Sequence, residues 1–133
     1  MEYLIGLALA VAVCLFALFS GFDRDRVFYP AMVIVVAQYY ILFAILAGST
    51  RALTMESLAA GVFLALAIAG FKKNLWLAVV GLVGHGVFDF FHHHLIANPG
   101  VPTYWPGFCM AFDLLAGGFL ALLIRRRRFA TPV

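Results

Sequence analysis

Apolar residues form five long stretches along the chain, and short polar breaks separate them. The stretches cover residues 2–20, 29–47, 52–70, 74–96 and 107–124. Each has roughly the 20 residues that an α-helix needs to cross about 30 Å of hydrocarbon. Apolar and polar residues do not alternate within them, as they would in the strands of a membrane barrel. The pattern predicts an all-α fold, a polytopic membrane bundle of five transmembrane helices that forms a single domain over residues 1–133.

The amino-acid composition also indicates a membrane protein rather than a soluble one. Hydrophobic residues make up 65% of the chain and charged residues 11%. A soluble core of this size could not bury so much apolar surface. The first stretch has no basic residue before it and no Ala-x-Ala site after it, so it is expected to remain as a span rather than to be cleaved.

Basic residues gather at one side of the predicted bundle. Of the nine Lys and Arg residues, eight follow the first, third and fifth apolar stretches, which end on the same side of the membrane. Only Arg51, between the second and third stretches, falls on the other side. Because basic residues favour the cytoplasmic side, the N-terminus is predicted outside and the C-terminus inside, in a bacterial inner (plasma) membrane. The net charge of +3 then reflects membrane anchors. Membrane lipids are the expected partners, with about 1 kcal/mol per charge at anionic headgroups, and no nucleic acid is expected.

The fourth stretch carries the candidate chemistry. It contains all four histidines of the chain and one aspartate: His85, Asp89, His92, His93 and His94. Ionisable side chains at membrane depth cost about 2.5 kcal/mol or more, so such a concentration favours a functional role. At 100° per residue, all of these except His94 fall within an arc of about 100° on one helix face.

Polar residues on neighbouring helices are predicted at the same depth in the membrane as this helix face. With a rise of about 1.5 Å per residue, five polar residues from three helices are predicted in one layer of the outer leaflet, and His85 lies deeper. The five are Glu56, Asp89, His92, His93 and Asp113. Cys14 and Cys109 are expected at depths about 15 Å apart, too far for a disulfide.

Imidazole and carboxylate groups in one layer indicate a site for a divalent metal. The predicted ligands are His85, Asp89, His92 or His93, and Asp113, with zinc favoured and iron or manganese as alternatives. The predicted function is a metal-dependent membrane hydrolase of a lipid or another hydrophobic substrate. Glu56 would act as general base, and Asp113 would be a catalytic ligand or would orient a ligating imidazole.

Other functions remain open. A di-iron oxygenase is a variant of the enzyme hypothesis. The same polar residues could form a proton or cation relay, although the fourth stretch has no titratable residue between His85 and its inner end. They could also fix the packing of an accessory or binding subunit. A homo-oligomer is compatible with each of these functions.

Two segments resemble a small bacterial integral-membrane family of unknown function. They are residues 21–30, which include GFDRDR and FYP, and residues 84–113. The spacing from His85 to Asp89 is similar to the HxxxH pair of alkaline-ceramidase-like membrane hydrolases, which bind zinc. The segment from Asp89 to His93 is similar to an HxxHH box of fatty-acid hydroxylases and desaturases with its first histidine replaced. These local resemblances imply that a small helical membrane protein can hold a His/Asp metal site.

Overall fold

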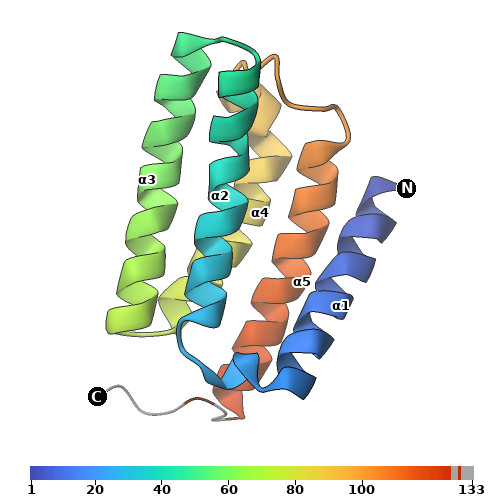
Figure 1. Cartoon of the computed structure of the whole chain (residues 1–133), viewed down its shortest axis with the longest axis vertical. Helices are drawn as coiled ribbons and strands as arrows, with labels where there is room; N and C mark the ends of the chain where they lie inside the picture. Colours follow the sequence, from blue (N-terminus) through green and yellow to red (C-terminus); the bar gives the residue numbers. More distant parts are fainter. Residues whose placement is uncertain (127–128, 130–133) are drawn as a thin grey trace.

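The computed structural model describes residues 1–126 and 129 of the chain. The regular secondary structure of this part is entirely helical, with no β-strand. Figure 1 shows its five α-helices and one short 3₁₀ helix, η1. In chain order they are α1 (Glu2–Ser20), η1 (Phe22–Arg24), α2 (Phe28–Leu46), α3 (Thr50–Lys72), α4 (Trp76–Leu95) and α5 (Trp105–Arg125). The predicted all-α fold is confirmed.

The α-helices run alternately up and down, so that successive helices are antiparallel (Figure 1). The main helix pairs are α4 with α5, α1 with α5, and α2 with α3. Helix α4 also packs against α2 and α3, whereas α1 lies at the edge of the bundle beside α5. This arrangement places α4, the helix with the histidines, against three neighbours.

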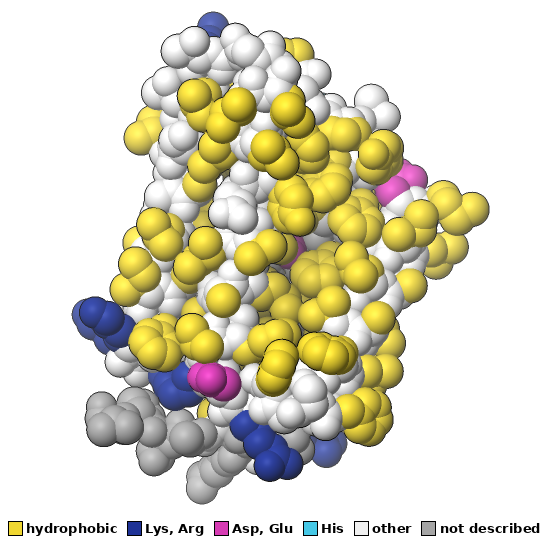
Figure 2. All heavy atoms as spheres, in the orientation of Figure 1, with side chains coloured by type: hydrophobic (Ala, Val, Ile, Leu, Met, Phe, Trp, Pro, Cys, Tyr) yellow, Lys and Arg dark blue, Asp and Glu magenta, His cyan; other side chains and the backbone are white. Residues whose placement is uncertain are grey.

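Four helices, α1, α2, α3 and α5, are long and apolar enough to span a membrane. Helix α4 is similar in length but contains four histidines and Asp89, and it is not among these four. Many large apolar side chains of the bundle are exposed, among them Leu4, Phe16 and Leu58. Figure 2 shows such side chains spread over the visible face. A surface of this kind is expected of a protein that faces lipid.

The helix boundaries differ by a few residues from those predicted, for local reasons. Helix α3 begins two residues early because Ser49 Oγ accepts a hydrogen bond from the backbone nitrogen of Ala52 at 3.2 Å. This is a standard N-cap. Helix α5 begins at Trp105 with Pro106 in its first turn. Proline needs no hydrogen-bond partner there, so it starts this helix rather than ending the preceding loop.

Most basic residues lie at one end of the bundle. Lys and Arg side chains gather at the η1 end, and one lies at the other end (Figure 2). At the η1 end, Arg26 donates hydrogen bonds to the carbonyl oxygens of Gly70 and Phe71, at 3.4 and 3.1 Å. Arg127 and Arg128, part of the predicted basic segment, lie outside the described residues.

Small residues bring α4 and α5 close together near the polar residues. A Cβ atom on Gly86 would lie 3.1 Å from Leu114 and 3.4 Å from the Cβ of Asp113. A Cβ atom on Gly117 would lie 2.8 Å from the side chain of Val83. The two backbones can therefore approach more closely than bulkier residues would allow.

Candidate metal centre

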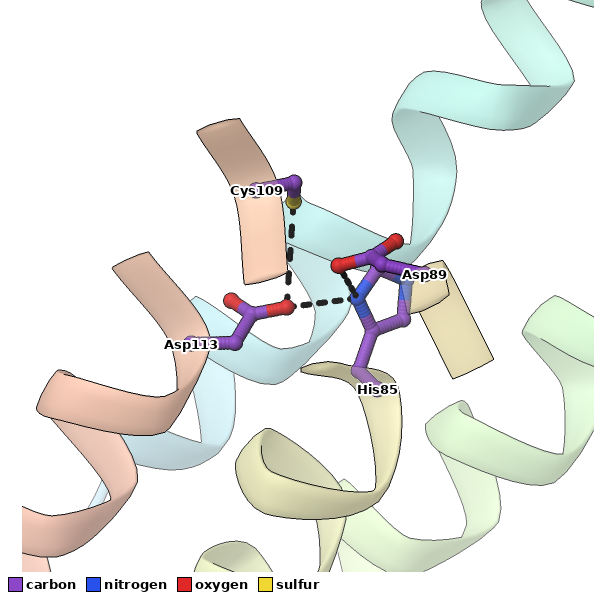
Figure 3. Close-up of side chains that lie close together, drawn as sticks. All are labelled: His85, Asp89, Cys109 and Asp113. Carbon is purple, nitrogen blue, oxygen red and sulfur yellow. Dashed lines mark hydrogen bonds and ion pairs between the residues drawn. The ribbon is translucent and has the colours of Figure 1, made fainter. Parts of the chain in front are cut away.

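Four buried side chains converge between α4 and α5. Two come from α4 and two from α5, and we call them the four-residue group: His85, Asp89, Cys109 and Asp113 (Figure 3). Each offers one potential ligand atom, and these atoms all lie within 4.8 Å of one another. None of the four residues is more than 3% exposed. This buried group could hold a metal ion.

The sequence places these residues together by helical periodicity. His85 and Asp89 are one turn apart on α4, and Cys109 and Asp113 are one turn apart on α5, so each pair shares a helix face. The close approach at Gly86 then brings the two faces into contact. Aromatic side chains surround the imidazole of His85, with the rings of Phe63 and Phe88 at centroid distances of 4.8 and 5.8 Å.

Short contacts join the members of the four-residue group. The Nδ1 atom of His85 lies 2.6 Å from Asp113 Oδ2 and 3.4 Å from Asp89 Oδ2. Cys109 Sγ donates a hydrogen bond to Asp113 Oδ2 at 3.7 Å. The 2.6 Å contact is in the range of a charge-assisted hydrogen bond. One imidazole thus faces two carboxylates in a region shielded from water.

Several polar atoms of this group lack hydrogen bonds. Among the described residues, His85 Nε2, Asp89 Oδ2 and Asp113 Oδ1 are buried and have no hydrogen-bond partner. Asp89 Oδ2 retains only its ion-pair contact with His85. Buried polar atoms normally have partners because desolvation without one is costly. Unused lone pairs on the two carboxylates of this group favour a bound cation.

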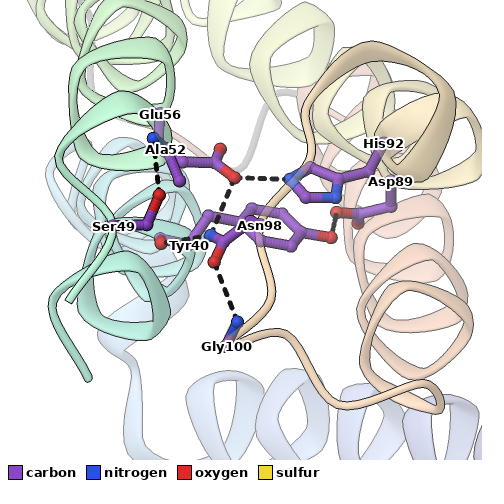
Figure 4. Close-up of polar contacts among 8 residues, drawn as sticks. All are labelled: Tyr40, Ser49, Ala52, Glu56, Asp89, His92, Asn98 and Gly100. Carbon is purple, nitrogen blue, oxygen red and sulfur yellow. Dashed lines mark hydrogen bonds and ion pairs between the residues drawn. The ribbon is translucent and has the colours of Figure 1, made fainter. Parts of the chain in front are cut away.

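A second polar cluster lies beside the first, between α3, α4 and the loop at residues 96–104. His92 Nε2 contacts Glu56 Oε1 at 2.6 Å, and both side chains are buried (Figure 4). Asn98 donates to the same Glu56 oxygen at 3.0 Å and to the backbone oxygen of Tyr40 at 3.0 Å. Asn98 Oδ1 in turn accepts a hydrogen bond from the backbone nitrogen of Gly100 at 3.2 Å. We call Glu56, His92 and Asn98 the Glu56–His92 cluster.

Tyr40 on α2 connects the two clusters. Its hydroxyl donates to Asp89 Oδ1 at 2.6 Å, in the four-residue group. Its ring stacks on the imidazole of His92, with centroids 3.9 Å apart and planes 9° from parallel. Tyr40 is 1% exposed. Residues of α2, α3, α4 and α5 thus form one continuous buried polar region.

A cavity of about 560 Å³ reaches this region from one end of the bundle. Its walls come from the start of α1, the end of α4, the loop at residues 96–104 and the start of α5. Asp89 of the four-residue group lines it, as do His92 and Asn98 of the Glu56–His92 cluster, so both clusters reach the cavity. The volume lies within the range of about 300–1,000 Å³ that is typical of small-molecule sites.

The predicted site residues fall into three sets in the structure. His85, Asp89 and Asp113 are in the four-residue group, and Glu56 and His92 pair with each other. His93 is exposed and lies outside both clusters, with its ring 4.0 Å from that of His94. His85, Asp89 and His92 span an arc of about 60° on α4, whereas His93 lies about 40° beyond it at 100° per residue. Because the narrower arc faces the neighbouring helices, His93 lies outside both clusters, although it lines the cavity.

Three functional candidates are new from the structure: Cys109, Tyr40 and Asn98. Cys109 is four residues before Asp113, and this spacing places it on the same face of α5. That periodicity could have identified it in the sequence. Tyr40 and Asn98 follow no comparable pattern, because their contacts depend on how α2 and the loop at residues 96–104 pack.

Comparisons with protein-family models, with curated proteins and with solved structures found no match for this chain. The resemblance to a bacterial membrane-protein family therefore stays a prediction.

Proposed function

We propose that the chain is an integral membrane protein in which all five α-helices span the bilayer, with the η1 end toward the cytoplasm. Helix α4 is included because its polar residues His85, Asp89 and His92 are buried against other helices and so avoid lipid. The basic side chains at the η1 end support this orientation. Reporter fusions at each end of the chain would test it. A bacterial inner membrane is the proposed location.

The four-residue group is proposed to hold one divalent metal ion, with zinc favoured over iron and manganese. The observation that carries this assignment is the convergence of four potential ligand atoms within 4.8 Å in a buried position. A thiolate beside an imidazole and carboxylates suits zinc and other transition metals better than magnesium or calcium. Cys109 therefore strengthens the preference for zinc.

Metal binding at this group requires a small rearrangement. Two nitrogen or oxygen ligands of tetrahedral zinc lie about 3.3 Å apart when each bond is about 2.0 Å long. His85 Nδ1 and Asp113 Oδ2 lie 2.6 Å apart. A proton joins them at this distance, and a metal ion would displace it and separate the two atoms. Binding is thus expected to release protons.

The proposed reaction is hydrolysis of a lipid or another hydrophobic substrate. A metal ion would supply Lewis-acid polarisation of the substrate and of water. His92 lines the cavity and is held through Nε2 by Glu56, so His92 is better placed than Glu56 to accept a proton there. Glu56 then acts by orienting this imidazole and stabilising its positive charge. Asp113 is proposed as a ligand.

The distribution of buried polar residues supports a localised site over a transmembrane relay. Below His85 toward the η1 end, the described core is formed largely by apolar side chains such as Val33, Leu75 and Leu82. Of the described Asp, Glu and His side chains that are buried, only Asp23 lies at the η1 end. Hydrolysis is therefore the function that we favour.

An activity assay would test this function. Purified protein in liposomes would be given long-chain esters and amides, and product release would be measured with and without zinc. Hydrolysis by the wild type that falls at least about 100-fold in His92→Ala, within the range for loss of a general base, is the expected result. His94→Ala is the control, because His94 is exposed, lies outside both clusters and does not line the cavity. Equal activity in the two variants would contradict the role of His92.

A further inference from the structure

The cavity described above has an unusual charge. Its lining includes two acids, Glu2 at the start of α1 and Asp89 near the end of α4, and two histidines, His92 and His93. None of the described lining residues is Lys or Arg. Arg51, the basic residue at this end of the bundle, is exposed on α3 and does not line the cavity. Glu2 also contacts the amino group of Met1 at 3.4 Å, in a pair that is open to solvent.

A bound metal ion would not reverse this charge. Two carboxylates and one thiolate of the four-residue group carry three negative charges when they act as ligands, and a divalent ion supplies two positive charges. The loaded group therefore remains negative. Glu56, in the adjacent Glu56–His92 cluster, adds another acid, which is hydrogen-bonded to His92. The electrostatic field at the cavity favours cations and opposes anions in either state.

The remaining walls are mostly apolar. Phe90, Ile96, Pro102 and Met110 line the cavity. Phe90 is 61% exposed on the outer surface of α4, so this wall continues onto the lipid-facing side of the bundle. An apolar chain could extend along it from the cavity toward the bilayer.

We propose that the cavity binds a cationic amphiphile, a single-chain molecule with an amine head group and an ester or amide bond, as the substrate class of the site. The amine would lie near the acidic side chains, and the hydrocarbon chain would pass Phe90 and Met110. That the bound molecule is a substrate rests on the proposed function. A molecule in the cavity would lie beside Asp89 and His92. An anionic phospholipid headgroup is disfavoured by the same carboxylates, since no lysine or arginine lines the cavity to pair with it.

Photolabelling would test the proposal directly. Purified protein would be irradiated with dodecylamine that carries a diazirine on its chain, and with dodecyl phosphate that carries the same group. The amine is expected to label the cavity-lining residues about fivefold or more above the phosphate, the ratio for one partly exposed ion pair. Glu2→Gln should reduce this preference, and Met110→Trp, which fills the cavity, should reduce labelling by both probes.

Leu58→Trp provides the control for an added indole, because Leu58 is 67% exposed on α3 and lies outside the cavity. It should leave labelling unchanged. Equal or stronger labelling by the phosphate would overturn the charge selection, and labelling confined to lipid-facing positions would overturn the site. The same measurement on chelator-treated protein separates this inference from the proposed function. Selective amine labelling there would support the cavity even if metal analysis found no ion.

Discussion

His85 Nδ1 on α4 lies 2.6 Å from Asp113 Oδ2 on α5, and this contact joins the two helices within the buried core. The two residues are 28 positions apart in the sequence. A pair of this kind is costly to break from one side, because the remaining group stays buried without its partner. The pair therefore couples the packing of α4 and α5 to the chemistry of the four-residue group.

Tyr40→Phe is expected to destabilise the protein. The substitution removes the 2.6 Å hydrogen bond to Asp89 Oδ1 but keeps the ring that stacks on His92. Leaving a buried carboxylate oxygen without a donor costs about 1–3 kcal/mol. Thermal unfolding in detergent should show a lower Tm. Tyr39→Phe, which changes a partly exposed tyrosine on the same helix, should leave Tm unchanged.

Gly117→Ala is expected to separate α4 from α5. The new Cβ would lie 2.8 Å from the side chain of Val83 and 3.3 Å from Leu82, and such overpacking typically costs about 1–3 kcal/mol. Both Tm and metal affinity should fall. Gly118→Ala is the matched control, since nothing lies within 4 Å of its Cβ. An equal effect of the two substitutions would contradict the close packing at Gly117.

Asn98→Ala is expected to loosen the loop at residues 96–104. It removes the hydrogen bonds from Asn98 to Glu56 and Tyr40, and the one that Asn98 accepts from Gly100. Hydrogen exchange of the loop amides should become faster, because local opening would break fewer contacts. Thr103→Ala, an exposed change in the same loop, should not have this effect. Unchanged exchange in Asn98→Ala would show that other contacts hold the loop.

Binding of Co²⁺ in place of zinc is expected to show that the Cys109 thiolate is a ligand. Co²⁺ bound at the four-residue group should give a sulfur-to-cobalt charge-transfer band in the near ultraviolet, because Cys109 would be a ligand. Cys109→Ser should abolish this band. Cys14→Ser should retain it, since Cys14 is also buried and free but belongs to the apolar core cluster. A band that depends on Cys14 would contradict the assignment.

Helical geometry explains what the sequence could predict. The length of the apolar stretches identified the five α-helices, and a fixed rise per residue placed Asp113 near Asp89 and Glu56 near His92 in depth. The rotation of a helix about its axis is set by its neighbours. For that reason the sequence did not separate His92, which is buried, from His93, which is exposed. Loop contacts such as those of Asn98 have no periodicity and could not be predicted.

The most direct measurement is elemental analysis of the detergent-purified protein, with the wild type beside His85→Ala, Asp113→Ala and the control His94→Ala. We expect close to one zinc, iron or manganese ion per chain in the wild type and in His94→Ala, and a loss of metal in the other two variants. His94 is exposed and outside both clusters, so it should not affect binding. Wild-type protein that contains no metal even after reconstitution, or metal content unchanged in His85→Ala, would contradict the metal centre.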